Sequence, residues 1–241
     1  MDRDADIYST RYVKALFDEM SRTYGYINRI SSFGFNTRWR SQCVGQIAMT
    51  PQMTVCDLMS GMGECWRAID SALGPGGRIV ALDFSAEMCR NARVQRQRLP
   101  HRAIEILEQD ALSSSLPDGS VDCIISAFGL KTFNDHQQAA FAREIARILR
   151  PAGSVSLLEI SVPSTRFLRI PYMFYLKRVI PVIGRLMLGN PDNYRMLGAY
   201  TERFGNCERM GEHLRAAGLE VENRHYFFGC ASGLYALKPV L

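Results

Sequence analysis

Acidic residues and glycines follow three successive strand-like segments of the chain, at spacings that suit a nucleoside-binding site. Asp57 lies in an apolar run that leads into a glycine-containing turn at residues 60–63, and glycine lets a ligand approach the backbone closely. Asp83 ends the next apolar run, 20 residues beyond Gly63, a distance at which an acid can accept hydrogen bonds from ribose hydroxyls. Asp110 follows the third run, where it can serve the exocyclic amine of a base. The predicted cofactor-binding residues are Asp57, Ser60, Gly61, Gly63, Asp83, Phe84, Asp110, Ala111 and Ser126.

The glycine patterns that cradle phosphates are missing from the sequence. The chain contains neither G-x-G-x-x-G, which disfavours NAD, nor G-x-x-x-x-G-K-[ST], which disfavours ATP. Gly61 and Gly63 also suit an ordinary tight turn, and Asp83 also suits the cap of a following helix. Because such residues come at three successive strand ends, we favour a nucleoside held without a phosphate cradle. The sequence therefore predicts S-adenosyl-L-methionine as the cofactor.

Strand-like and helix-like segments alternate from residue 50 onward. We expect strands at residues 54–59, 78–83, 103–107, 121–127 and 154–160, and helices at residues 65–72, 85–99, 137–149 and 208–217. Strands that alternate with helices imply right-handed crossovers and a parallel sheet covered on both faces. Residues 220–228 and 233–237 are expected to add an antiparallel hairpin at the sheet edge. The predicted fold is α/β, a doubly wound, mostly parallel, seven-stranded sheet.

Length and composition favour one domain over residues 1–241. The chain has 47% hydrophobic and 22% charged residues, which is a globular composition. Residues 1–49 are expected to form a helical N-terminal cap, and residues 162–206, with four prolines and no strand signal, a helical insert. No apolar stretch is long enough to span a bilayer, and the first 20 residues carry acids where a signal peptide would be basic. Seven cysteines without a C-x-x-C pair are read as reduced core thiols in a cytosol.

The positive charge of the chain is concentrated in one segment. The formal net charge is +5, and residues 166–195 carry six arginines and lysines against one aspartate, which equals the surplus of the whole chain. Within residues 166–178 these cations alternate with aromatic and aliphatic residues. That pattern suits either a lid packed on the domain or a helix that lies on anionic lipid. A nucleic-acid partner is disfavoured because the cations are interleaved with large apolar residues.

Four further motifs give the chain a resemblance to a known family. They are the segment YGYINRISSFG at residues 24–34 with the Trp-Arg pair at 39–40, FGLK at 128–131, LRPAG at 149–153 and DNYRML at 192–197. Together they resemble the ubiquinone/menaquinone-biosynthesis C-methyltransferases, class I enzymes that use S-adenosylmethionine, over nearly the whole chain. The resemblance implies the Rossmann-like class I methyltransferase fold.

The cofactor loop departs from that family. The methyltransferases read roughly D-x-A-G-G-T-G-D, whereas residues 57–64 here read DLMSGMGE, and Lys131 and Thr132 stand where the family favours Arg and Asn. These departures resemble the rhodoquinone-biosynthesis branch, which implies replacement of a ring methoxy group of ubiquinone by an amino group from S-adenosylmethionine, with manganese (Mn2+) as the metal. The alternatives are C-methylation of a quinol or phenol precursor of ubiquinone or menaquinone, and a non-catalytic scaffold in a quinone-biosynthesis complex.

The two chemistries make different demands on the site. Methyl transfer to a ring carbon needs a base near the ring, whereas amine transfer needs an unprotonated amino group and a polarised quinone oxygen, which a divalent cation can supply. Manganese favours oxygen and imidazole ligands. The predicted catalytic residues are Glu64, Asp135, His136 and Tyr194, and the candidate metal ligands are Glu64, His136 and Glu159. Each also has a structural interpretation: His136 as a helix-start residue, Glu159 as a backbone partner and Tyr194 as a helix-packing residue.

The resemblance also implies where the protein works. A polyprenyl quinone is held in a membrane, so we expect a cytoplasmic protein that associates peripherally with the inner membrane through its basic, apolar segment. The oligomeric state is left open by the sequence.

Overall fold

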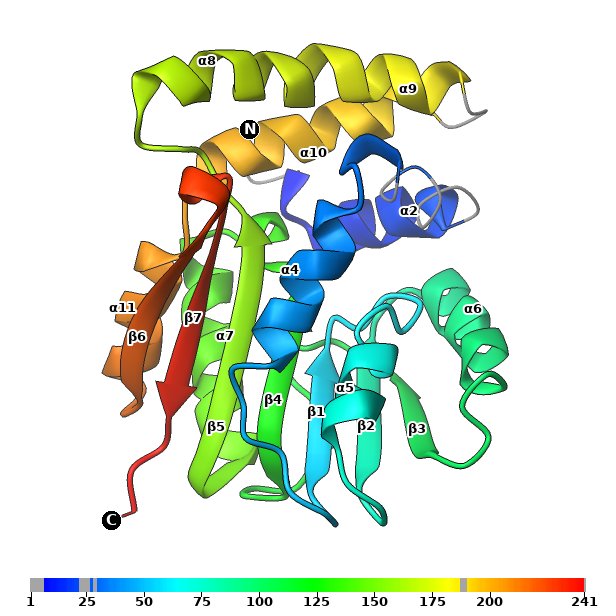
Figure 1. Cartoon of the computed structure of the whole chain (residues 1–241), viewed down its shortest axis with the longest axis vertical. Coiled ribbons are helices and arrows are strands. Elements are labelled where there is room, and N and C mark those ends of the chain that lie inside the picture. The colour runs from blue at the N-terminus through cyan, green and yellow to red at the C-terminus, as the bar shows by residue number, and fades with distance from the viewer. Residues whose placement is uncertain (1–6, 22–26, 28–29, 187–189, 241) are drawn as a thin grey trace.

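One seven-stranded sheet forms the centre of the computed structural model, which describes residues 7–21, 27, 30–186 and 190–240 (Figure 1). In hydrogen-bonding order the strands are β3 (Ala103–Glu108), β2 (Arg78–Asp83), β1 (Thr54–Leu58), β4 (Val121–Ala127), β5 (Leu149–Ile160), β7 (Ala231–Leu237) and β6 (Glu220–Tyr226). Strands β1 to β5 are parallel, and β7 runs antiparallel to both of its neighbours. The predicted doubly wound, mostly parallel sheet with an antiparallel edge hairpin is confirmed.

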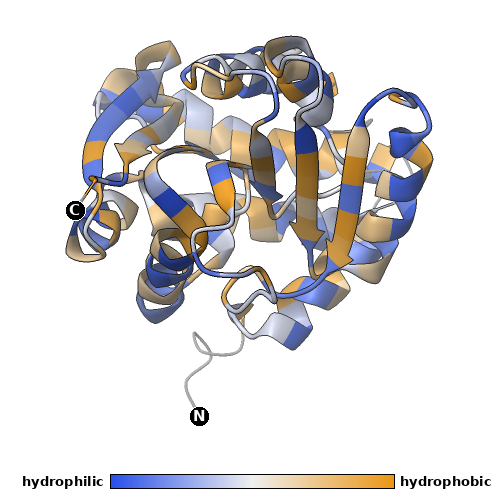
Figure 2. Ribbon diagram, turned by 90° about the horizontal axis from the view of Figure 1, so that it is seen from below, coloured by the Kyte–Doolittle hydropathy of each residue, from blue (hydrophilic) through white to orange (hydrophobic). Residues whose placement is uncertain are grey.

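Helices cover both faces of this sheet. On one face the core includes α7 (Asp135–Ile148) and α11 (Glu208–Ala216), and on the other α4 (Phe35–Val44), α5 (Trp66–Ala72) and α6 (Ala86–Arg96). Strand β1 serves both faces because side chains alternate along a strand: Cys56 and Leu58 belong to the first core and Val55 to the second. Figure 2 shows hydrophobic strands enclosed by helices whose outer surfaces carry hydrophilic residues.

The helical regions predicted at the N-terminus and after β5 are also present. Before the sheet the structure has α2 (Thr10–Met20) and α4. After β5 come α8 (Arg166–Phe174), the π-helical turn η2 (Tyr175–Val179), α9 (Ile180–Leu186) and α10 (Pro191–Phe204). Figure 1 shows α2, α8, α9 and α10 above the carboxyl ends of the parallel strands. Residues 22–26, 28 and 29 of the N-terminal region, which include part of the YGYINRISSFG motif, lie outside the described residues.

Strand β5 begins earlier than the sequence predicts. Its expected start was Ser154, but β5 begins at Leu149, which pairs with Val121, and the register shifts before Cys123 pairs with Ser154. Ala152 inside this stretch has a φ of 61°. A bulge of this kind lets a strand detour around Pro151, which cannot donate a ladder hydrogen bond.

All seven cysteines are buried and free of disulfides. No helix in the described part of the chain is long and apolar enough to cross a membrane.

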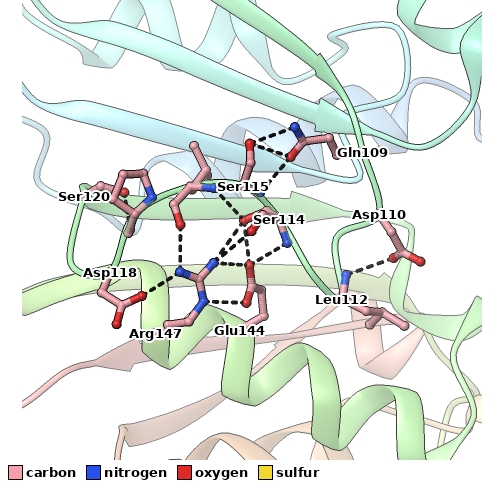
Figure 3. A network of polar contacts seen from close by, with 11 residues as sticks. Gln109, Asp110, Leu112, Ser114, Ser115, Asp118, Ser120, Glu144 and Arg147 are labelled. Carbon is pink, nitrogen blue, oxygen red and sulfur yellow. Dashed lines mark hydrogen bonds and ion pairs between the residues drawn. The ribbon is translucent and has the colours of Figure 1, made fainter.

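A polar network around the buried Glu144 carboxylate holds the loop between β3 and β4 against α7 (Figure 3). The Glu144 carboxylate accepts hydrogen bonds from Ser114 N (2.8 Å) and from Arg147 Nη2 (2.7 Å). Arg147 also donates to the Leu116 carbonyl (2.7 Å) and pairs with Asp118 (2.7 Å). The guanidinium lowers the pKa of Glu144 against the opposing effect of its burial. The network therefore fixes the loop that begins at Gln109 and carries the residues after β3.

Glu144→Gln is expected to reduce the free energy of unfolding by about 1.5 to 3 kcal/mol, because it removes the charge from hydrogen bonds of this buried group. Urea unfolding at pH 7 measures the change. Glu105→Gln, at an exposed position of β3, is the matched control and should change little. Equal stability of the Glu144 variant and the wild type would contradict the assigned role.

Candidate active site

A cavity of about 860 Å³ lies at the carboxyl ends of β1, β2 and β4. Most of the predicted cofactor residues meet there, although they come from three separate strand ends. Those that line it are Asp57, Ser60, Gly61, Asp83, Phe84, Asp110 and Ala111. Two of the predicted residues do not line it. Gly63 has a φ of 86°, and a Cβ atom there would lie 2.5 Å from the Trp66 ring; Ser126 is fully buried within β4.

The turn after β1 is held by backbone hydrogen bonds to acids. Gly61 N donates to Asp83 Oδ2 (2.8 Å), Ser85 N donates to Asp83 Oδ1 (2.9 Å), and Met62 N donates to Glu64 Oε2 (3.0 Å). Gly61 has a φ of 56°, in the left-handed region that glycine reaches without strain. Burial raises the pKa of Asp83 to about 6, although the two backbone donors oppose that shift. The hydrogen bond between Gly61 and Asp83 therefore fixes both the position of the turn and the orientation of the Asp83 carboxylate.

Three polar atoms in the lining lack hydrogen-bond partners within the described chain. Asp57 Oδ2, Ser60 Oγ and Glu64 Oε1 are buried and unpartnered. Buried polar atoms are normally hydrogen-bonded, so these atoms point to a polar, cationic ligand group. The ammonium group of S-adenosylmethionine fits this set of acceptors, and the strand-end acids fit its ribose and base. The residues present thus suit the predicted cofactor.

Asp57 is the most perturbed of these acids. Desolvation by burial raises its pKa to about 8, and the negative charge of Glu64 adds to the shift. A cationic ligand would stabilise the charged form of such a carboxyl group, and without the ligand the group can hold a proton near neutral pH.

The N-terminal region lines this cavity, as expected of a helical cap, and so does Arg40, which was not predicted as a site residue. The Arg40 guanidinium lies 4.7 Å from the centre of the Phe128 ring. Tyr8, Val13 and Phe17 close the cavity from the side of α2, which Lys14 ties to the Phe84 carbonyl (2.8 Å). The sequence identified Arg40 only as part of the Trp-Arg motif. Its contact with the strand ends could not be predicted, because no sequence spacing relates a residue in α4 to the end of β4.

A second cavity of about 1120 Å³ lies next to the first, and Phe128 lines both. Its walls are mainly aromatic and aliphatic, with the polar residues Ser31, Ser32, Asn36 and Thr201 among them, and Lys131 is the one charged side chain among its described lining residues. The predicted catalytic residue Tyr194 lies here, buried in α10. Other walls come from α4, η2 and the 3-10 turn η3 (Phe227–Gly229). This cavity suits an apolar, ring-shaped substrate.

Two predicted catalytic residues line neither cavity. Asp135 and His136 are exposed in the first turn of α7. Asp135 pairs with Arg209 (2.6 Å) and His213 (2.9 Å) of α11, and the hydrogen bond from Arg209 lowers its pKa. Asn134 caps α7, and Gln137 near the start of this helix lines the first cavity, whereas Asp135 and His136 do not. A catalytic role for either residue therefore stays a prediction without geometric support.

The three candidate metal ligands do not come together. Glu64 lies in the first cavity, His136 is exposed on α7, and Glu159 is fully buried in an ion pair with Lys131. The described residues contain no group of three His, Cys, Asp or Glu side chains that could hold a metal ion. The proposed donor set does not fit a manganese site, so no step is derived through the metal.

The parallel sheet, its strand order and the cavity over β1 and β2 define the fold of S-adenosylmethionine-dependent methyltransferases. A SAM-dependent methyltransferase from Aquifex aeolicus matches this fold with a TM-score of 0.58 at 20% identity, over 82% of this chain and 88% of that one.

The chain belongs to the ubiE/COQ5 methyltransferase family, whose model matches residues 5–238. It is 32% identical over 219 residues to the demethylmenaquinone methyltransferase of Thermus thermophilus, covering 90% of this chain and 97% of the relative. It is 28% identical over 229 residues to the ubiquinone/menaquinone biosynthesis C-methyltransferase of Hahella chejuensis, covering 94% and 89% of the two chains. The resemblance read from the motifs is confirmed at the level of the family.

Asp57→Asn is expected to stabilise the free protein, and more so at pH 8 than at pH 5. The pKa of Asp57 is about 8 in the folded protein, against an ordinary value of 3.8. Between these values the folded state holds a proton that the unfolded state has lost, so wild-type stability falls as the pH rises. The amide variant has no such slope.

Thermal unfolding at both pH values measures the effect, with Asp192→Asn at an exposed position of α10 as the control. A stability difference that does not grow between pH 5 and pH 8 would contradict the buried, high-pKa state of Asp57.

Proposed function

We propose that this protein is an S-adenosylmethionine-dependent C-methyltransferase that acts on a quinol or phenol precursor of menaquinone or ubiquinone. The observation that carries the proposal is the pair of cavities that share Phe128, one lined by unpartnered acids and the other by apolar side chains. The family supports it, as do relatives named for quinone methylation. The geometry leaves the polar cavity for the cofactor and the apolar cavity for the ring.

When bound, the cofactor supplies an electrophilic methyl group on its sulfonium. Asp57 and Glu64 would hold its ammonium, and Asp83 its ribose hydroxyls. Tyr8 and Phe17 exclude water from the polar side, and Phe128 lies at the edge that the two cavities share. Holding the two reactants in adjacent cavities supplies the proximity that transfer between them requires.

Amine transfer to ubiquinone, the reaction of rhodoquinone biosynthesis, is the second candidate. Two observations favour it. Glu64 and Asp57 offer unpartnered carboxyl oxygens where an ammonium would bind, and Asp57, with a pKa of about 8, can take up a proton from that group. In addition, the described lining of the apolar cavity contains no carboxylate or imidazole that could deprotonate a phenol. A quinone electrophile needs no such base.

Product analysis by mass separates these functions. The purified protein is incubated with S-adenosylmethionine and either a demethylated quinol or ubiquinone, with and without manganese. Methyl transfer yields a quinol heavier by one CH2 group, whereas amine transfer yields an aminoquinone from ubiquinone. Asp83→Ala should abolish either product by preventing cofactor binding.

An aminoquinone as the sole product would overturn C-methylation. If neither product forms and calorimetry finds no cofactor binding by the wild type, the non-catalytic scaffold becomes the better interpretation.

We also propose that the basic, apolar segment docks on an anionic membrane surface. The helix α8 has no buried residue, and Phe167, Ile170 and Phe174 on it are 92%, 60% and 62% exposed. The exposed side chains of Phe33 and Phe227 belong to the lining of the apolar cavity itself. Exposed arginines accompany them at 166, 169, 178 and 185. Apolar side chains beside cations suit an anionic lipid interface, from which a polyprenyl quinone could enter.

Binding to vesicles with anionic lipid is expected, and it should weaken with added salt and with Arg169→Glu/Arg178→Glu. These positions are chosen because Lys177, in contrast, pairs with Glu202. Each lost cation removes about 1 kcal/mol of attraction. Co-sedimentation measures binding, and Arg98→Glu, exposed beyond the end of α6, is the control. Binding that is absent or insensitive to salt would count against the docking surface.

A further inference from the structure

A buried lysine stands where the two cavities meet. Lys131 belongs to the short 3-10 helix η1 (Leu130–Thr132) after β4, and its side chain is 4% exposed. Its Nζ donates to the Phe128 carbonyl (2.8 Å) and to Glu159 Oε1 (2.9 Å). Because Phe128 lines both cavities, the ammonium group lies beside the boundary between the cofactor and the ring.

Both carboxylate oxygens of Glu159 accept hydrogen bonds from Lys131. It is fully buried near the end of β5. Its Oε1 accepts from Lys131 Nζ and from Ile160 N (2.7 Å), and its Oε2 accepts from Lys131 N (3.1 Å). Taking an ammonium group out of water costs free energy that an opposite charge can offset. The pairing with Glu159 therefore compensates the burial of Lys131 and fixes its position.

One N–H donor of the Lys131 ammonium group has no acceptor among the described residues. A protonated lysine has three N–H donors, and the described residues supply acceptors for two of them. Lys131 lines the apolar cavity, whose other described walls carry no charge. A cation in a mainly apolar cavity orients a ligand by its oxygen.

We propose that Lys131 binds the ionised oxygen of the substrate ring next to the carbon that reacts, with Glu159 as the residue that positions it. This inference rests on the proposed function and names the group that recognises its substrate class, an aromatic ring bearing a hydroxyl or carbonyl oxygen. In methyl transfer, the phenol loses its proton to water and the ammonium stabilises the phenolate, whose ring carbon would take the methyl group as the S–CH3 bond breaks and would then lose its own proton to water. In amine addition to a quinone, a C–N bond forms, the C=C pair moves to the neighbouring C–C bond and the carbonyl π pair moves to the oxygen, where the same ammonium meets it. That pair returns to the ring when the methoxy group leaves as methanol. One side chain thus serves either reaction.

Ionisation of bound 1-naphthol tests the proposal without turnover. The absorbance of the naphtholate is titrated in the presence of excess protein. The wild type is expected to lower the pKa of the bound probe by about 1 to 3, as an opposite charge within hydrogen-bonding distance does. Lys131→Met should abolish that shift, and Lys131→Arg should retain part of it.

Lys131→Met leaves Glu159 buried without a partner and can unfold the chain, so Lys131→Met/Glu159→Gln is made as well. Removing both charges avoids the uncompensated carboxylate, and it should also abolish the shift in the pKa of naphthol. Tyr172→Phe, which removes a hydroxyl from the same cavity, is the matched control and should keep the shift. Calorimetry with S-adenosylmethionine checks that each variant is folded and still binds the cofactor.

Equal naphthol pKa values in the wild type and in the folded double variant would overturn the proposal. A wrong assignment of the reaction would give a different experimental result. If the protein lowers the pKa of naphthol through Lys131 but modifies no quinone or quinol, the binding role stands and the assigned reaction falls.

Discussion

The desolvation of two carboxylates at the ends of neighbouring strands is the constraint on which the site depends. Asp57 and Asp83 are buried, and burial raises the pKa of each. Their charged forms are tolerable only where hydrogen-bond donors or cations meet them. The chain supplies Asp83 with the N–H groups of Gly61 and Ser85, which requires the tight turn after β1. Asp57 Oδ2 has no hydrogen-bond partner among the described residues, and this leaves it for a ligand.

The second organising feature is the position of Phe128, which lines both cavities. This residue has a φ of 71°, a left-handed conformation that costs a non-glycine residue about 1 to 2 kcal/mol. The Arg40 guanidinium lies over its ring, and its carbonyl accepts a hydrogen bond from Lys131. The strained loop is therefore held from two sides. It separates an acidic cavity from an apolar one, so that a charged cofactor and an apolar ring can be bound without sharing an environment.

Sequence reasoning succeeded where the signal was local and failed where it was not. The alternation of strands and helices predicted the sheet, and strand-end spacing placed Asp83 and Asp110 at one cavity. Asp135 and His136 were predicted as catalytic residues because a carboxylate or an imidazole can act as a base or bind a metal. In the structure both lie at the exposed start of α7, where Arg209 of α11 binds Asp135, so their role stays a prediction without geometric support. The departures in the cofactor loop do lie in the site, but their chemical consequence depends on neighbours that the sequence does not identify.

By itself, the sequence determined the order of the elements, the strand ends that carry acids and the family of the chain. These follow from periodicity, spacing and motifs, which are properties of short segments. Only the tertiary structure decided which side chains share a cavity. It brought Arg40 against Phe128, paired Lys131 with Glu159, and sent Asp135 to the surface. The physical reason is that burial and pairing of charges depend on contacts between segments far apart in the chain, and no local pattern encodes the environment that those contacts create.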